Sequence, residues 1–300
     1  MQAEDLKSRI LKKKKKLNAV IMAHYYQVPE IQEIADFVGD SLALARQAAR
    51  TDAEVIVACG VMFMAETAKI LNPDKIVLIP DPEAGCPMAD MITAEALRAK
   101  KAEMPDAAVV CYVNTSAAVK AESDICCTSA NAVEVISSIP ARQRILFVPD
   151  RNLGTYATQA TGRDIVCWPG FCPVHDRLTV EKVNSAKTNR ALVIAHPECP
   201  PPITAVADQV GSTGKMMKTA ADPTVNNFVI ATETGLLYSL RQAHPDKNFV
   251  PADPQMICAD MKKITLEKLL YALEHLYQPV EVPEDIRRRA LAATERMLAL

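Results

Sequence analysis

Residues 19–26, with the sequence AVIMAHYY, form a short apolar run that ends in polar side chains. This pattern is typical of a buried parallel strand, whose two faces are both covered and whose polar groups lie beyond its end. The pattern returns at residues 108–114 (AVVCYVN) and at residues 191–198 (ALVIAHPE). Three copies in one chain indicate an internal repeat.

Each copy continues in the same way. A helical stretch leads to a second polar signature, which ends at Ser41, Ser129 or Thr213 and opens another helix, predicted at residues 42–50, 130–138 and 214–220. Further strands are predicted at residues 55–58, 145–148 and 228–231, and final strands at residues 76–79, 164–167 and 247–250. Strands that alternate with helices predict α/β units with parallel sheets.

The spacing of the cysteines that close the copies is the strongest sign of the repeat. Cys86, Cys172 and Cys258 are separated by 86 and 86 residues. Thr93, Thr179 and Thr265 follow at the same interval, and each has a Glu two positions later. A Thr cap with an acid in the first turn predicts a helix start.

The predicted fold class is α/β. We expect three repeated small three-layer α/β/α domains with parallel sheets, in a pseudo-threefold arrangement around a central cluster site. The predicted domains are residues 1–88 with Cys86, residues 89–174 with Cys172 and residues 175–260 with Cys258. Residues 261–300 are expected to form C-terminal helices that pack back on the body, the last of them started by Pro283.

Composition excludes several classes of function. The chain has 300 residues, a net charge of -2 and 5% aromatic residues, so it offers neither a basic field nor stacking surfaces for nucleic acid. No apolar run reaches the ~18 residues that a membrane span needs, and the N-terminus does not resemble a signal peptide. We therefore expect a cytoplasmic protein without nucleic-acid or membrane partners.

Nine cysteines in a cytoplasmic chain argue against a disulfide framework. Most are expected to be buried apolar residues. In parallel sheets, ligands bind beyond the carboxyl ends of the strands, so a threefold arrangement would bring Cys86, Cys172 and Cys258 together. Three thiolates without a fourth protein ligand suit a [4Fe–4S] cluster with one open iron better than a closed zinc site. His175 lies three positions after Cys172, but a zinc site there would need two more local ligands.

The polar residues around the expected centre suit anionic ligands and proton transfer. Helix starts at Ser41, Ser129 and Thr213 offer N–H groups and hydroxyls to anions, although plain helix capping explains them equally well. His24, Tyr112 and His196 follow the three first strands, with Tyr26, Asn114 and Glu198 two positions later. Side chains two apart in a strand share one face, so each pair is expected to face the centre.

These residues resemble the quinolinate synthase family of de novo NAD biosynthesis, in its short form, over essentially the whole chain. The matching stretches are residues 23–27 (AHYYQ), 35–41 (ADFVGDS), 64–73 (MAETAKILNP), 112–114 (YVN), 128–132 (TSANA), 196–199 (HPEC) and 212–214 (STG). The family usually has Asn where Tyr25 stands. The resemblance implies a [4Fe–4S] cluster on Cys86, Cys172 and Cys258, whose open iron acts as a Lewis acid.

The implied reaction condenses iminoaspartate with dihydroxyacetone phosphate to quinolinate, phosphate and two waters. The implied catalytic residues are Tyr26, His24, Tyr112, His196, Glu198 and His175. The implied substrate-binding residues are His24, Ser41, Tyr112, Asn114, Ser129, His196, Glu198, Ser212 and Thr213. Because iminoaspartate is short-lived in water, coupling to L-aspartate oxidase or aspartate dehydrogenase is expected.

Three other classes stay open from the sequence. Two further kinds of three-domain enzyme also place one cluster cysteine in each domain: the radical enzyme of diphthamide synthesis, which needs S-adenosylmethionine, and the reductase of late isoprenoid synthesis. A non-catalytic iron–sulfur sensor is the third alternative. It would give no reason for acid–base residues at the strand ends.

Overall fold

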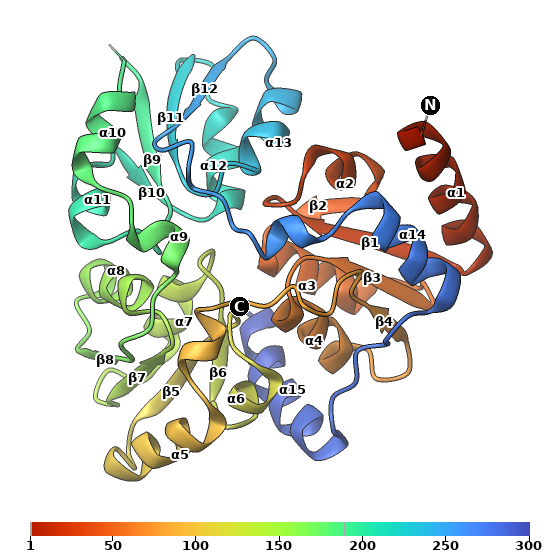
Figure 1. Ribbon diagram of the computed structural model, residues 1–300. Helices are drawn as coiled ribbons and strands as arrows, with labels where there is room; N and C mark the ends of the chain where they lie inside the picture. The colour runs from red at the N-terminus through yellow and green to blue at the C-terminus, as the bar shows by residue number, and fades with distance from the viewer. Residues whose placement is uncertain (1, 189) are drawn as a thin grey trace.

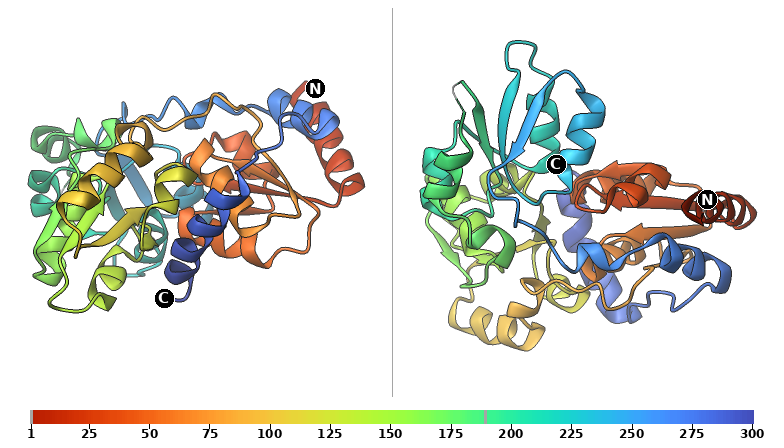
Figure 2. Two further views of the ribbon diagram at one scale, coloured as in Figure 1. Left: turned by 90° about the horizontal axis from the view of Figure 1, so that it is seen from below. Right: turned by 45° about the horizontal axis from the view of Figure 1, so that its top comes forward.

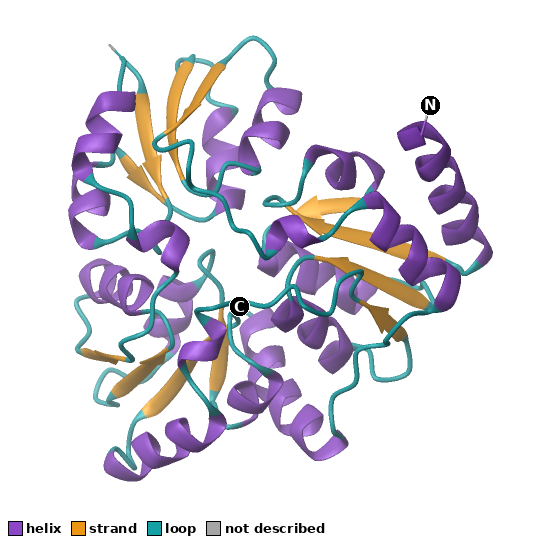
Figure 3. Cartoon of the chain, viewed as in Figure 1, coloured by secondary structure: helices purple, strands orange, loops and turns teal. Residues whose placement is uncertain are grey.

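The computed structural model describes residues 2–188 and 190–300, and it has three lobes arranged around a centre (Figure 1). Each lobe is built on one four-stranded parallel sheet with helices against it (Figure 3). The predicted α/β fold in three repeated units is confirmed. Figure 2 shows the same three lobes from two other directions.

The three lobes have matching element orders. The first contains α1 (Gln2–Lys16), β1 (Ala19–His24), α2 (Pro29–Ile34), β2 (Phe37–Gly39), α3 (Ser41–Arg50), β3 (Val55–Cys59), α4 (Met62–Leu71) and β4 (Ile76–Leu78). After the short helix η1 (Ala89–Met91), the second contains α5 (Ala94–Glu103), β5 (Ala108–Tyr112), α6 (Ala117–Ala121), β6 (Ile125–Cys127), α7 (Ala132–Ser138), β7 (Ile145–Val148), α8 (Arg151–Thr161) and β8 (Ile165–Cys167).

The third lobe follows the turn of helix α9 (Pro173–Asp176). It contains α10 (Val180–Ala186), β9 (Leu192–Ala195), α11 (Pro201–Val206), β10 (Gln209–Val210), α12 (Thr213–Ala220), β11 (Asn227–Ala231), α13 (Leu236–Ala243) and β12 (Asn248–Pro251). The chain ends with η2 (Met261–Lys263), α14 (Leu266–His275) and α15 (Glu284–Leu298).

The strand order is the same in all three sheets: β2-β1-β3-β4, β6-β5-β7-β8 and β10-β9-β11-β12. The sequence prediction missed the short edge strands β2, β6 and β10. Just before each of these edge strands stands an aspartate whose carboxylate accepts a hydrogen bond from a backbone amide of the adjacent inner strand. Asp36 accepts from the Ile21 amide at 2.8 Å, Asp124 from Val109 at 2.7 Å and Asp208 from Val193 at 2.8 Å.

Both faces of the first sheet are buried, because alternate residues of β1 enter different cores. Ile21 and Ala23 pack with α1, α2 and α14, whereas Val20 and Met22 pack with α3 and α4. Burial on both faces is what a near-continuous apolar strand predicts. Thr93, Thr179 and Thr265 cap α5, α10 and α14, as predicted.

The two C-terminal helices lie against earlier lobes. Helix α14 packs beside α1, with Leu269 and Leu273 in the core that holds Ile21. Helix α15 packs against α6, β6 and α4, so it joins the first lobe to the second. Among the described helices, none is both long enough and apolar enough to cross a membrane.

Candidate active site

The carboxyl ends of β1, β5 and β9 point toward one cavity at the centre of the three lobes. These are inner strands of their sheets, so their ends lie at the point where ligands bind in open parallel sheets. The cavity holds about 640 Å³ of space, part of it open to solvent. Its lining includes all of the predicted site residues except Ser212: His24, Tyr26, Ser41, Cys86, Tyr112, Asn114, Ser129, Cys172, His175, His196, Glu198, Thr213 and Cys258.

The three repeat-spaced cysteines reach this cavity from three different loops. Cys86 follows β4, Cys172 follows β8, and Cys258 follows β12. All three thiols are free. Burial raises the pKa of Cys86 to about 12 and raises the pKa values of Cys172 and Cys258 as well. A group that binds thiolates here must therefore displace protons.

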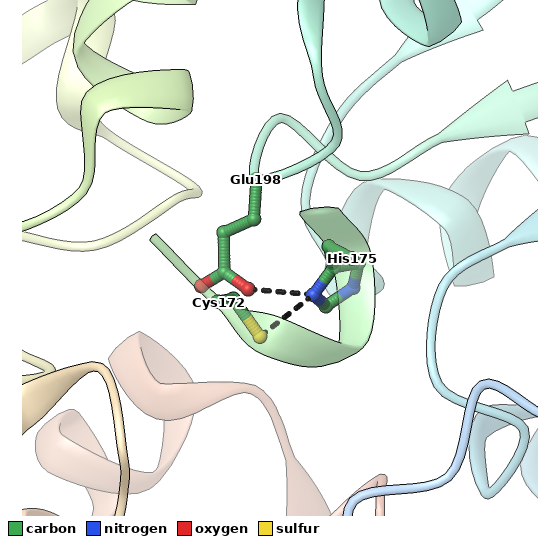
Figure 4. Close-up of side chains that lie close together, drawn as sticks. All are labelled: Cys172, His175 and Glu198. Atoms are coloured by element: carbon green, nitrogen blue, oxygen red, sulfur yellow. Dashed lines mark hydrogen bonds and ion pairs between the residues drawn. The ribbon is translucent and has the colours of Figure 1, made fainter. Parts of the chain in front are cut away.

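Cys172, His175 and Glu198 lie close together at one side of the cavity (Figure 4). His175 Nδ1 is 3.2 Å from Cys172 Sγ and 2.8 Å from Glu198 Oε2. One ligand atom from each of the three residues falls within 4.8 Å of the others. Among the described residues, no such group includes Cys86 or Cys258. The three repeat-spaced thiols therefore do not all lie within 4.8 Å of one another.

The Glu198 carboxylate lies next to several other polar side chains of the cavity. The Tyr112 hydroxyl donates to Glu198 Oε1 at 2.5 Å, and His196 Nδ1 lies 3.8 Å from Glu198 Oε2. His196 Nε2 is in turn 3.2 Å from Ser129 Oγ. Asn152 donates to the Glu198 backbone carbonyl at 3.0 Å and helps to fix this loop. The carboxylate thus connects groups from the second and third lobes.

Burial sets the protonation of most of these groups. It lowers the pKa values of His24 and His196 to about 3, so both rings are neutral at neutral pH. It raises the pKa values of Tyr26 and Tyr112 well above the usual range, an effect that Glu198 reinforces. Burial also acts to raise the pKa of Glu198, but His175, His196 and the Tyr112 hydrogen bond outweigh it and lower that pKa. The Glu198 carboxylate therefore stands in a cavity with the neutral rings of His24 and His196 and two protonated phenols.

The structure corrects the expected helix starts. The N-caps of α3 and α12 are Asp40 and Ser212, which accept from the Ala43 and Lys215 amides at 2.9 and 3.2 Å. Ser41 and Thr213 are the first helical residues, so their hydroxyls are not used as caps and line the cavity. Ser129 does not start a helix, because α7 begins three residues later. Ser212 lies off the lining in its capping role.

Several residues of the site were missed by the sequence analysis. Thr232 follows β11 and touches both Tyr26 and His175. Glu233 lines the cavity, accepts from the Cys258 amide at 3.1 Å and pairs with Lys262 at 2.9 Å. The available signal was an acid next to a strand end, which recurs in the second copy as Asp150 but not in the first, where Val61 stands. Thr232 has no equivalent hydroxyl in the other copies.

Comparison with known proteins shows the family to which the chain belongs. The family model described as "Quinolinate synthetase A protein" matches residues 8–299. A quinolinate synthase of Desulforudis audaxviator is 54% identical, with 99% of each chain covered. One of Geobacter metallireducens is 50% identical over 100% of this chain and 99% of its own. "Quinolinate synthase 2" of Methanosarcina acetivorans is 48% identical over 100% of this chain and 97% of its own. The chain therefore belongs to the quinolinate synthetase A protein family.

Proposed function

We propose that this protein is a quinolinate synthase, which condenses iminoaspartate with dihydroxyacetone phosphate to quinolinate, phosphate and two waters in de novo NAD biosynthesis. The observation that carries the proposal is that repeat-equivalent thiols and acid–base groups line one cavity in a chain that matches this family end to end. Small-molecule substrates suit a site enclosed between three lobes.

Cys86, Cys172 and Cys258 would hold a [4Fe–4S] cluster. Three free thiols, one from each lobe, match a cluster with one iron left open. When bound, the cluster supplies Lewis-acid chemistry at that iron, which favours the loss of hydroxide from the substrate. The chain's own residues then bind the substrates, orient them and move protons.

Both substrates are anionic, and the cavity offers them hydroxyls and helix starts. Ser41 and Thr213 stand at the first positions of α3 and α12, where backbone N–H groups and the helix dipole favour anions. Ser129 adds a third hydroxyl. Asn114 Oδ1 is buried and has no hydrogen-bond partner among the described residues, so a ligand donor would satisfy it. We assign carboxylate and phosphate binding to Ser41, Ser129, Thr213 and the side-chain NH2 of Asn114, whereas Asn114 Oδ1 would accept from a substrate N–H or hydroxyl.

We assign the proton transfers of the reaction to the groups around Glu198. His196 lies between the Ser129 hydroxyl and the Glu198 carboxylate. Its Nδ1 accepts from the Glu198 backbone amide at 3.3 Å, so the proton of the neutral ring is on Nε2, which faces Ser129. A neutral imidazole can accept a proton, and the carboxylate stabilises the charge that forms. Tyr26 and Tyr112 keep their protons at neutral pH and are suited to donate them to a leaving hydroxide. His24 and His175 complete the proposed catalytic set.

The supply of iminoaspartate is part of the proposal. This imine is short-lived in water, so an enzyme that oxidises aspartate, an L-aspartate oxidase or an aspartate dehydrogenase, must produce it nearby.

An anaerobic turnover assay tests the reaction. Cluster-reconstituted protein receives dihydroxyacetone phosphate and iminoaspartate generated in place, and quinolinate is detected by mass. We expect quinolinate only with the cluster intact. Cleavage of added S-adenosylmethionine, or turnover that depends on an added reductant, would instead favour the diphthamide-type or the isoprenoid-type enzyme.

The ligand assignment is tested by single cysteine variants. Changing Cys86, Cys172 or Cys258 to Ala should abolish the cluster about equally, as measured by iron and sulfide per chain. Cys59→Ala is the control, because Cys59 is a free, buried thiol that is not on the cavity wall. Full iron loading in the three single variants would refute the assignment.

A further inference from the structure

A buried carboxylate of the third lobe holds the backbone of the Cys258 loop. Glu233 lies two positions after β11, and its side chain is fully buried. Its Oε1 accepts from the Cys258 amide at 3.1 Å, and its Oε2 accepts from the Gly235 amide at 2.7 Å. One of these two backbone groups belongs to a proposed cluster ligand. The position of Cys258 therefore depends on Glu233.

The positive charge beside Glu233 comes from Lys262, in the short helix η2. Its Nζ is 2.9 Å from Glu233 Oε1, and it also donates to the backbone carbonyl of Tyr26. An ammonium group has three donors, so it can make both bonds at once. Tyr26 follows β1 of the first lobe, whereas Glu233 belongs to the third. Lys262 therefore connects the Cys258 loop with the backbone of a proposed catalytic residue in another lobe.

A second hydrogen bond joins the same two parts of the chain. The fully buried Gln27 donates from Nε2 to the Met261 carbonyl at 2.8 Å. The backbones meet closely here, because a Cβ added to Gly235 would lie 2.9 Å from both Lys262 Nζ and the Tyr26 carbonyl carbon. We call residues 25–27 the tyrosine segment and residues 258–263 the ligand segment. Two side chains, one from each segment, thus hold them together.

The ion pair is a feature of the third copy alone. Matching backbone bonds run from Met62 to Ala84, from Arg151 to Gly170 and from Thr234 to Met256. The residues directly before these donors are Val61, Asp150 and Glu233. Four positions after the three repeat-spaced cysteines stand Asp90, Asp176 and Lys262. An acid and a lysine occur together only in the third copy, so the repeated fold does not require this pair.

We propose that Glu233, Lys262 and Gln27 couple the ligand segment to the tyrosine segment, so that cluster binding at Cys258 fixes the backbone of Tyr26. They are positioning residues, because they act through Cys258 and Tyr26. A group that restrains one segment restrains the other through the bonds between them. This inference rests on the proposed function, in which Cys258 is a cluster ligand and Tyr26 is catalytic.

Hydrogen exchange with and without the cluster tests the coupling without any measurement of activity. The amides of Tyr25, Tyr26 and Gln27 bond to the Gly39 carbonyl, to His24 Nδ1 and to the His24 carbonyl. Their exchange therefore requires local opening of the tyrosine segment. We expect anaerobic loading of the wild type to slow exchange about tenfold in both segments, a usual size for coupling between two sites. Mass spectrometry of the peptides that cover each segment gives the rates.

The double variant Gln27→Leu/Lys262→Met removes both bonds between the segments. Loading should still slow exchange of its ligand segment about tenfold, but should change that of the tyrosine segment less than about twofold. Lys182→Met is the matched control, because Lys182 also pairs with a buried acid of the third lobe, Asp253, at 2.6 Å. Among the described residues it makes no bond to the first lobe, and the variant should respond to loading like the wild type. Iron and sulfide per chain should be equal in all three proteins.

The outcomes separate this coupling from a merely structural role and from the proposed function. A structural role would speed exchange with and without the cluster and leave the effect of loading unchanged. Full protection of the tyrosine segment in the loaded double variant, or none in the loaded wild type, would overturn the coupling. If the double variant does not fold, each single variant should lose part of this protection, and full protection in both would have the same meaning. A loaded wild type whose ligand segment stays unprotected would overturn the assignment of Cys258 as a ligand, and the coupling with it.

Discussion

Glu198 distinguishes two metal-binding arrangements in the cavity. It belongs both to the compact group with Cys172 and His175 and to the hydrogen-bond network that includes Tyr112. If the three thiols hold a cluster, Glu198→Gln keeps iron and sulfide. Turnover falls at least about 10²-fold, because the carboxylate that stabilises the protonated imidazole is gone. Iron, sulfide and kcat per chain are the measurements.

Glu103→Gln, at an exposed position of α5, is the control for Glu198→Gln. It should change neither metal content nor turnover. Loss of metal in Glu198→Gln alone would instead indicate a single ion held by Cys172, His175 and Glu198.

The two buried histidines make stability depend on pH. His24 and His196 have folded pKa values of about 3 against an ordinary value of 6.5, because burial disfavours their charged forms. The unfolded chain therefore binds more protons below about pH 6.5, and folding stability falls as pH falls, by up to about 1.4 kcal/mol per pH unit for each ring. The melting midpoint should fall between pH 7 and pH 5.

In His24→Asn and His196→Asn the fall in midpoint should be shallower. His275→Asn, at an exposed ring, should keep the wild-type slope. An unchanged slope in both buried-site variants would mean that these rings are already protonated in the folded protein.

Residue identities could be predicted from the sequence where they recur at fixed intervals. The three cysteines and the strand-end residues were found in this way, and all of them line the cavity. Thr232 and Glu233 were not, because neither belongs to a complete series: Gly60 and Pro149 stand at the positions equivalent to Thr232. An acid equivalent to Glu233 recurs only as Asp150, since the first copy has Val61 there. Contacts between lobes depend on how the lobes meet, and no periodic pattern encodes that.

At the scale of the element, two adjacent residues at the start of α3 have different roles: one caps the helix and the next faces the cavity. Asp40 accepts from the Ala43 amide, whereas Ser41 makes no capping bond and faces the cavity. Asp40→Ala should therefore lower the free energy of unfolding by about 1 kcal/mol through the lost cap. Ser41→Ala should leave stability nearly unchanged and raise KM for dihydroxyacetone phosphate or iminoaspartate.

Urea unfolding and steady-state kinetics check this pair of variants. Ser212→Ala and Thr213→Val form the equivalent pair on α12, where Ser212 is the cap. If Ser41→Ala destabilised the protein as much as Asp40→Ala without any change in KM, Ser41 would be a structural residue.

The central strands of each sheet and the edge strands β4, β8 and β12 could be predicted, but the edge strands β2, β6 and β10 could not. Central strands such as β1, β5 and β9 read as continuous apolar runs because both of their faces are covered. Edge strands β2, β6 and β10 have only two or three residues each, which is too short for an apolar run to mark them. The aspartates before them, at spacings of 88 and 84 residues, were the available signal.

At the scale of the whole molecule, the repeat spacing predicted that three lobes would meet at one centre, but it did not predict how the chain closes the ring. Helix α14 has no fourth lobe to enter, and it packs on the first instead. Helix α15 then joins the first and second lobes, with Met297 buried in the large core of the second lobe. Covalent connection and these two helices therefore hold the lobes together before any group binds between them.

The proposed cluster would add a further link between the lobes, since its three ligands come from three different loops. A group that binds only the folded state stabilises it, so anaerobic removal of the cluster with a chelator should lower the melting midpoint by about 5–15 °C, which corresponds to a few kcal/mol at this chain length. Cys86→Ala should have the melting midpoint of the chelated wild type, and the chelator should not change it. Cys59→Ala should show the wild-type fall. If the wild-type midpoint did not change on chelation although the iron had been lost, then α14, α15 and the lobe interfaces alone would fix the arrangement of the three sheets.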